Sequence, residues 1–367
     1  MFTTSVGVFV FGLLAAIAGG AVGAAIGGNY AFVLTGFCVL ASWGVFAATG
    51  NTFGLDYLAF GPFMGPHIAF AGGVAAAIYA RYRGHLGDGK DVNTPLAGIG
   101  HPDILCVGAA FGIFGYLCQI GISNIPWFGK HTDPVALTVL LSGLLARLIF
   151  GGVPGKGLFH GSLHNPELFH ENATSFPAKI KPGPNGRWLE WQEKPSQLLT
   201  IGSLFGIFAG GASLFLAANV GAYLTTRGLA NNLAAANANS FCFGISAVII
   251  LFLITNRNMP VQHHVTNIAG LAAVQFFPLL MGKTLTTYHW TYTSSWDSHT
   301  WGMATVALVI AAFFGVFTAG LGEFCARLWY NRGTSHIDPP PPTHIPPPAA
   351  AIWLGNTVVV SLATLFS

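Results

Sequence analysis

Apolar runs of about 20 residues follow one another along most of the chain, separated by short polar stretches. A run of that length matches the roughly 30 Å of hydrocarbon that a membrane helix must cross. The pattern predicts an all-α polytopic membrane protein with about ten transmembrane helices. The predicted spans cover residues 6–26, 30–48, 53–82, 104–125, 133–150, 198–218, 240–255, 259–281, 302–328 and 350–366. Residues 220–239 are rich in Ala and Asn, and the pattern leaves their fold open.

One long hydrophilic stretch, residues 151–197, divides the chain and is predicted to be a cytoplasmic linker. It separates a first membrane repeat, residues 1–150, from a second, residues 198–367. Within the second repeat, residues 338–348 are almost solid proline, and we call them the Pro-rich segment. Proline cannot continue a helix, so the sequence predicts an extended, cytoplasmic surface segment over about 333–349.

The third predicted span contains helix-breaking residues at the point where it should be deepest in the bilayer. Gly61, Pro62, Gly65 and Pro66 interrupt the apolar stretch just before His67. Backbone that is not helical is tolerated at membrane depth only inside protein or beside a water-filled cavity. A related break, in the sequence MPVQHHVTNIAGLAA, opens the eighth span at residues 259–273.

Short matches between the two halves of the chain indicate an internal repeat. His67 and the nine residues after it align with His264 and the nine residues after it. Residues 12–20 likewise resemble 203–211, and Asn29 recurs as Asn219 with the same spacing to a Leu-Thr pair. Looser matches join 109–114 to 311–317 and 138–142 to 357–361. The order of the matches predicts two five-helix repeats with interrupted third helices.

Lysine and arginine positions predict how the chain crosses the membrane, because short cytoplasmic loops are enriched in them. Basic residues mark the loop after the third span, the linker and the loop before the last span as cytoplasmic. These assignments agree only if each repeat has five spans, which inverts the second repeat and places both termini outside a plasma or inner membrane. Arg147 and Arg327 are expected to extend to lipid headgroups, and Glu323 is expected to pair with Arg327 four residues later.

Composition agrees with this class of protein. Of 367 residues, 53% are hydrophobic and 7% are charged, against about a quarter charged in soluble domains. The formal net charge of +3 has no dense basic cluster behind it, so no nucleic acid is expected as a partner. The five cysteines lie in apolar segments without metal-binding spacing and are expected to be packing residues.

The candidate chemistry is a pair of histidines at corresponding breaks. Ionisable groups at membrane depth are costly and often mark a pathway, and an imidazole can pass a proton or bind a polar solute. We predict that His67 and His264 share a midplane site between the repeats. The predicted supporting polar residues are His263, Gln262, Asn267, Asn29 and Asn219. Any such site is asymmetric, because the first half has Phe70 at the position of Asn267.

A second histidine group lies in the linker, where His160, His164 and His170 accompany two glutamates. Pro166 interrupts any helix there, so a solvated loop is favoured over a metal site. No catalytic residue, resident metal or cofactor is predicted, because nucleophile, nucleotide-binding and zinc-hydrolase motifs are absent from the sequence.

The stretch AGGAVGAAIGGNYAFVLTGF, residues 18–37, resembles an uncharacterised family of prokaryotic polytopic membrane proteins. In architecture alone, the predicted five-plus-five inverted arrangement resembles the urea and ammonium channels, which are commonly trimers. This resemblance implies a pore between repeats and a homo-oligomer, although the signature motifs of those families are absent.

The sequence favours a channel or facilitative transporter for a small polar solute or ion, embedded in the lipid bilayer. Two other classes stay open. One is a membrane-embedded metal- or haem-binding protein or enzyme that uses the same histidines. The other is a non-catalytic subunit of a larger membrane complex.

Overall fold

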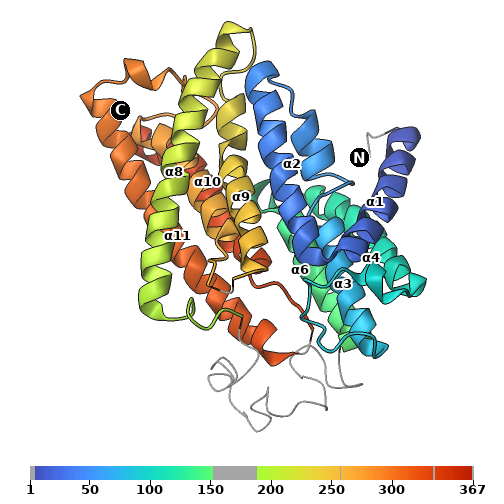
Figure 1. Ribbon diagram of the computed structural model, residues 1–367. Helices are drawn as coiled ribbons and strands as arrows, with labels where there is room; N and C mark the ends of the chain where they lie inside the picture. The colour runs from blue at the N-terminus through green and yellow to red at the C-terminus, as the bar shows by residue number, and fades with distance from the viewer. Residues whose placement is uncertain (1–4, 152–187, 257, 334, 366–367) are drawn as a thin grey trace.

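The computed structural model describes residues 5–151, 188–256, 258–333 and 335–365, and the described chain is helical (Figure 1). The first half contains α1 (Val6–Ile26), α2 (Gly28–Thr49), α3 (Ala69–Tyr82), α4 (Pro102–Ser123), α5 (Phe128–His131) and α6 (Pro134–Ala146). The second half contains α8 (Pro195–Thr226), α9 (Leu233–Leu253), α10 (His263–Leu280), α11 (Ser298–Leu328) and α12 (Pro346–Leu365). Residues 220–239, which the sequence left open, form the end of α8, a turn and the start of α9.

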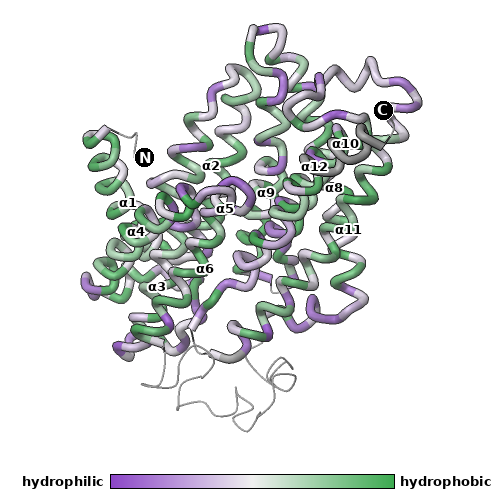
Figure 2. Tube along the Cα trace, turned by 180° about the vertical axis from the view of Figure 1, so that it is seen from behind, coloured by the Kyte–Doolittle hydropathy of each residue, from purple (hydrophilic) through white to green (hydrophobic). Residues whose placement is uncertain are grey.

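Seven helical segments in the described chain are long and apolar enough to cross a bilayer. They are α1, α2, α4, α8, α9, α11 and the segment Pro134–Gly151, which joins α6 to the π-helix Arg147–Gly151. Figure 2 shows hydrophobic residues along the long helices and hydrophilic residues concentrated near the ends of the molecule. The prediction of an all-α polytopic membrane protein is therefore supported at this level.

Glycines let the first and fourth helices of each half approach closely. In the first half, a Cβ atom at Gly20 of α1 would overlap the carbonyl oxygen of Gly108 in α4. In the second half, a Cβ atom at Gly315 of α11 would overlap the carbonyl oxygen of Gly202 in α8. In lipid, apolar side chains gain little free energy from leaving the surrounding hydrocarbon. Helices there associate through close packing at small residues.

The two halves meet mainly along α2 and α9, which pack against each other. Phe32 of α2 contacts Phe243 of α9 edge to face, with ring centroids 5.6 Å apart. Further along the same contact, the indole N–H of Trp43 donates to the hydroxyl of Ser240 at 2.8 Å. The interface is thus aromatic, with one directional polar contact that fixes its register.

Three connecting segments gather at one end of the molecule, which we call the linker end (Figure 1). The backbone N–H of Trp188 donates to the side chain of Asn331, and Gly89 forms an isolated parallel bridge with Ser335. Both chain termini lie toward the opposite end (Figure 1). The loop after α3, the described end of the linker and the loop before α12 therefore lie together.

Most of the Pro-rich segment is buried, so the prediction of an extended surface segment is wrong. Pro341–His344 forms a 3₁₀ turn whose four residues are all buried, and it contacts α6, α10, α11 and α12. Only one residue of the segment, Asp338, is charged, and each proline lacks the N–H that would otherwise need a partner. A proline run is therefore less costly to bury at membrane depth than most irregular backbone.

Arg147 does not extend to the lipid headgroups, because it is 1% exposed inside the protein. Its Nε donates to the hydroxyl of Ser335 at 2.5 Å, and its two terminal nitrogens donate to the carbonyls of Ser335 and Trp329. Nearby, Lys90 lies over the ring of Tyr330, 4.5 Å from its centroid. Burial lowers the pKa of the Lys90 ammonium group to about 7. The charge of Asp88 acts to raise this pKa, and the charge of Arg147 acts to lower it.

The expected helical ion pair is confirmed. Arg327 donates from Nε to Glu323 at 2.6 Å across one turn of α11. Glu323 is 6% exposed, so the pair places a carboxylate inside the protein and the arginine toward its edge.

Replacing Gly20 by alanine tests the close packing of α1 on α4. We expect Gly20→Ala to lower the free energy of unfolding by about 1–3 kcal/mol, because the new methyl group overlaps the α4 backbone. Gly44→Ala in α2 is the matched control, since a Cβ atom there meets nothing within 4 Å. Thermal unfolding in detergent compares the two variants, and equal melting temperatures would contradict the expected overlap.

Candidate functional site

The first helix break occupies residues 60–68, where the sequence placed it, and its backbone groups find partners within the protein. The hydroxyl of Thr35 in α2 donates to the carbonyl of Met64. The N–H groups of Gly65 and Ala69 donate to the carbonyls of Gly61 and Gly65. Regular helix resumes at α3, so the prediction of a glycine- and proline-induced break is confirmed.

The second break precedes α10, and a side chain from the end of the linker stabilises it. Gln192 is 3% exposed. Its amide nitrogen donates to the carbonyl of Val261, and its amide oxygen accepts from the N–H of the same residue. One glutamine therefore satisfies both backbone groups of a residue that lies outside any helix.

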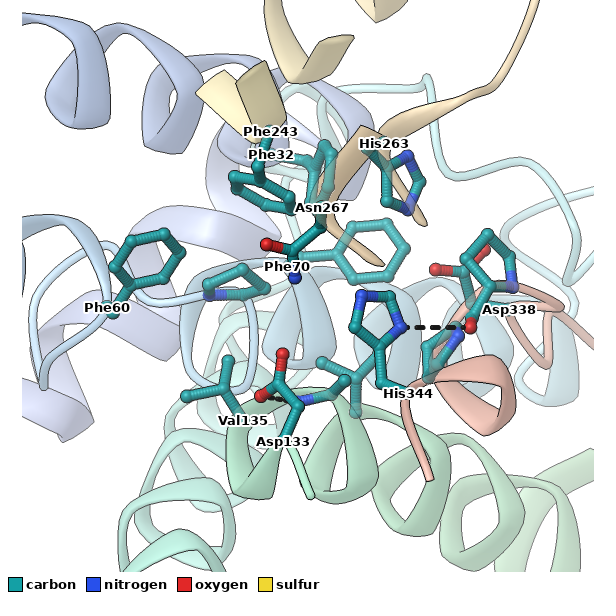
Figure 3. A pocket seen from close by; sticks show the side chains of 15 residues that line it. Phe32, Phe60, Phe70, Asp133, Val135, Phe243, His263, Asn267, Asp338 and His344 are labelled. Carbon is teal, nitrogen blue, oxygen red and sulfur yellow. Dashed lines mark hydrogen bonds between the residues drawn. The ribbon is translucent and has the colours of Figure 1, made fainter. Parts of the chain in front are cut away.

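A cavity lies where the two breaks, α6 and the Pro-rich segment come together (Figure 3). The centre of a water molecule can occupy about 40 Å³ of it, and it is partly open to solvent. Its lining residues come from both halves of the chain. They are Phe32, Phe60, Pro66, Phe70, Asp133, Val135, Ala136, Val139, Phe243, His263, Asn267, Asp338, Pro340, Pro341 and His344.

His263, the first residue of α10, presents a polar group within an aromatic wall. Its ring lies 4.7 Å from the ring of Phe32 and 6.0 Å from that of Phe243, centroid to centroid. The side chain is 5% exposed, and its Nδ1 has no hydrogen-bond partner within the described part of the chain. A buried imidazole nitrogen without a partner is costly, so this atom is a candidate for binding a ligand.

Asn267 lies one turn further along α10 and faces the cavity between aromatic rings (Figure 3). Its side-chain oxygen accepts a hydrogen bond from the amide of Asn239 in α9 at 2.5 Å. This contact orients the Asn267 amide group and leaves its nitrogen as a donor. Phe70 of α3 also lines the cavity, so the predicted asymmetry between Asn267 and Phe70 is present at its wall.

Two carboxylates at the cavity were not predicted from the sequence. Asp133 caps α6 by accepting the N–H of Ala136 at 3.0 Å, and its own N–H donates to the carbonyl of His344. Asp338 lies on the Pro-rich segment, 3.7 Å from Nε2 of His336. The Asp-Pro sequence at 133–134 is a recognisable helix start, but its proximity to residue 344 arises from packing between distant segments.

Neither His67 nor His264 lines this cavity. His67 is 1% exposed, and a Cβ atom at Gly115 of α4 would overlap its carbonyl oxygen. His264 is fully buried, and its Nε2 lies 2.9 Å from the position of a Cβ atom at Gly322 of α11. Each histidine thus packs against the fourth helix of its own half, and a direct pairing of the two rings stays a prediction.

Three other polar residues were predicted at the site. Gln262 is buried near the second break, and Asn29 and Asn219 make structural contacts with loops. Gln262 is 1% exposed and both of its amide atoms lack partners. Asn29 donates to the side chain of Asn93 at 2.6 Å, and Asn219 accepts from the backbone and hydroxyl of Thr293. Asn29 and Asn219 therefore fix loops and do not line the cavity. The histidine group at 160, 164 and 170 lies outside the described residues.

Long apolar helices and internally satisfied breaks define the class of this protein as a polytopic helical membrane protein with a cavity between its halves. The chain belongs to a family of unknown function (DUF7973), whose model matches residues 3–367. This agrees with the resemblance to an uncharacterised family and extends it over nearly the whole chain. No curated protein and no solved structure gives a significant match.

The contact between Gln192 and Val261 is testable by an apolar substitution of similar size. We expect Gln192→Leu to leave the N–H and C=O of Val261 without partners, at a cost of about 1–3 kcal/mol each. Gln119→Leu in α4 is the control, because that amide bonds only the hydroxyl of Ser123. Thermal unfolding in detergent is the measurement, and a smaller loss for Gln192→Leu than for Gln119→Leu would contradict the expectation.

Proposed function

We propose that this protein is a channel or facilitative transporter for a small polar solute or ion, which passes through the cavity between the two halves. The observation that carries the proposal is the composition of the cavity wall. Both halves contribute to it at their helix breaks, and a largely apolar lining is interrupted by polar side chains, those of Asp133, His263, Asn267, Asp338 and His344. Broken helices of this kind supply substrate sites near the midplane of many transporters.

We further propose that the halves are inverted five-helix repeats. In support, α3 and α10 both begin beside the cavity and run toward opposite ends of the molecule (Figure 1). At the linker end, Tyr79 of α3 contacts Phe150, with ring centroids 5.1 Å apart. At the other end, Phe277 of α10 contacts Trp290 at 5.5 Å.

The matched asparagines also support the inverted repeat. Asn29 binds Asn93 in the loop that follows α3, and Asn219 binds Thr293 in the loop that follows α10. Residues at aligned positions therefore make the same kind of contact at opposite ends of the molecule. An inverted repeat with five helices in each half accounts for this relationship directly.

The ten-span topology adds α3, α10 and α12 to the seven long apolar segments. In this arrangement the linker end is cytoplasmic, as the lysines and arginines of its loops favour, and both termini are outside. Only two of the described lining residues, Asp133 and Asp338, are charged, and a small number of charges favours facilitated passage over strong coupling to an ion gradient.

Flux measurements on purified protein in liposomes test this function. The panel contains formamide, urea, glycerol, potassium chloride and sodium formate, and we expect at least one to cross faster than in protein-free liposomes. Val135→Trp fills part of the cavity and should reduce that flux by about tenfold or more, equivalent to about 1.4 kcal/mol of barrier.

Val309→Trp is the matched control, because Val309 is 66% exposed on the surface of α11 and its replacement should leave flux unchanged. Protein-free rates for the whole panel, or equal flux in wild type and folded Val135→Trp, would contradict passage through this cavity.

A further inference from the structure

Four helices begin at the cavity, which gives its wall a distinctive electrostatic character. Its lining includes residues at or beside the N-termini of α3, α6, α10 and α12. Each helix N-terminus carries about half a positive elementary charge. Because α12 begins with three prolines, which have no N–H groups, the ends of α3, α6 and α10 supply about one and a half positive charges beside the carboxylates of Asp133 and Asp338. The wall therefore has no large net charge that could compensate a cation or an anion for the water it loses on entry.

The charged groups of the wall also have local contacts. Asp133 accepts the N–H of Ala136 as the cap of α6, and Asp338 faces His336. An anion entering a wall of four phenylalanines would lose water without meeting a lysine or arginine, and a cation would meet Asp133, which caps α6, and Asp338, which lies 3.7 Å from His336. The walls therefore disfavour ions more than they disfavour uncharged solutes.

Beside the two carboxylates, the wall offers uncharged hydrogen-bonding groups. Asn267 keeps an amide nitrogen as a donor, because its oxygen is already bonded to Asn239. His263 has an unpartnered Nδ1 and is 95% buried at the wall, given its exposed fraction of 5%. An imidazole nitrogen accepts or donates according to its tautomer. Together these residues match a ligand that both accepts and donates hydrogen bonds.

The wall residues at the two helix breaks differ in polarity between the halves. His263 and Asn267 lie at the start of α10, whereas Pro66 and Phe70 lie around the start of α3. A solute between them would meet hydrogen-bonding groups on one side and apolar surface on the other. A small, compact molecule with a polar edge satisfies both sides, and a fully hydrated ion satisfies neither.

We propose that the substrate is a small uncharged solute that both donates and accepts hydrogen bonds, recognised by Asn267 and His263. This inference rests on the proposed channel or transporter function and specifies its substrate class. Asn267 is then the residue that determines specificity, because the α10 side of the cavity differs from the α3 side most sharply at Asn267 and Phe70.

The experiment compares uncharged solutes with ions in the same liposomes. Light scattering follows entry of formamide, urea and glycerol, and electrical recording in planar bilayers follows potassium chloride, ammonium chloride and sodium formate. We expect flux of at least one uncharged solute and no current above the protein-free bilayer. Ion current without uncharged flux would overturn the substrate class while leaving a channel function intact. Transport of neither group would instead count against the proposed function itself.

Asn267→Asp is the decisive variant, because it retains the oxygen that accepts from Asn239 while it replaces the amide donor with a charged oxygen. We expect flux of the uncharged solute to fall by about tenfold or more. Asn237→Asp, at an α9 asparagine whose amide bonds only the carbonyl of Leu233, should leave flux unchanged.

If Asn267→Asp does not fold, His263→Gln supplies the second test. Its amide is neutral but cannot occupy the position of the imidazole Nδ1, so uncharged flux should again fall by about tenfold. Size-exclusion chromatography checks folding of each variant. Wild-type flux in a folded variant at both positions would overturn recognition by Asn267 and His263.

Discussion

Every backbone polar group at membrane depth must find a partner inside the protein, and this constraint determines how the two helix breaks are built. Thr35 accounts for the carbonyl of Met64 at the first break, and Gln192 accounts for both polar groups of Val261 at the second. The unwound backbone would otherwise cost several kcal/mol for each unsatisfied group. Satisfying it with side chains from neighbouring segments allows helices to begin beside a cavity.

Close helix packing complements these polar contacts. Glycines at the α1–α4 and α8–α11 crossings allow backbones to approach where a methyl group would overlap them. The same feature operates beside the histidines, since Gly115 and Gly322 make room for His67 and His264. The glycines that allow these close contacts therefore lie on the helices that flank the two breaks.

Local chemistry in the sequence was sufficient to predict the helical class, the break at residues 60–68 and the pairing of Arg327 with Glu323. It also identified His263 and Asn267 as candidate polar residues, both of which line the cavity. It did not locate Asp133 or the phenylalanines of the wall, because these meet only through packing of distant segments. The Pro-rich segment was placed on the surface because proline prevents a helix. Its scarcity of charge was the signal that it could be buried.

The hydrogen bonds of Arg147 have a consequence for biosynthesis. Its partner Ser335 lies 188 residues later in the chain, so α8 to α11 must be translated before this contact can form. During synthesis, Arg147 is therefore made long before Ser335 and Trp329, the later residues that accept its hydrogen bonds in the folded protein.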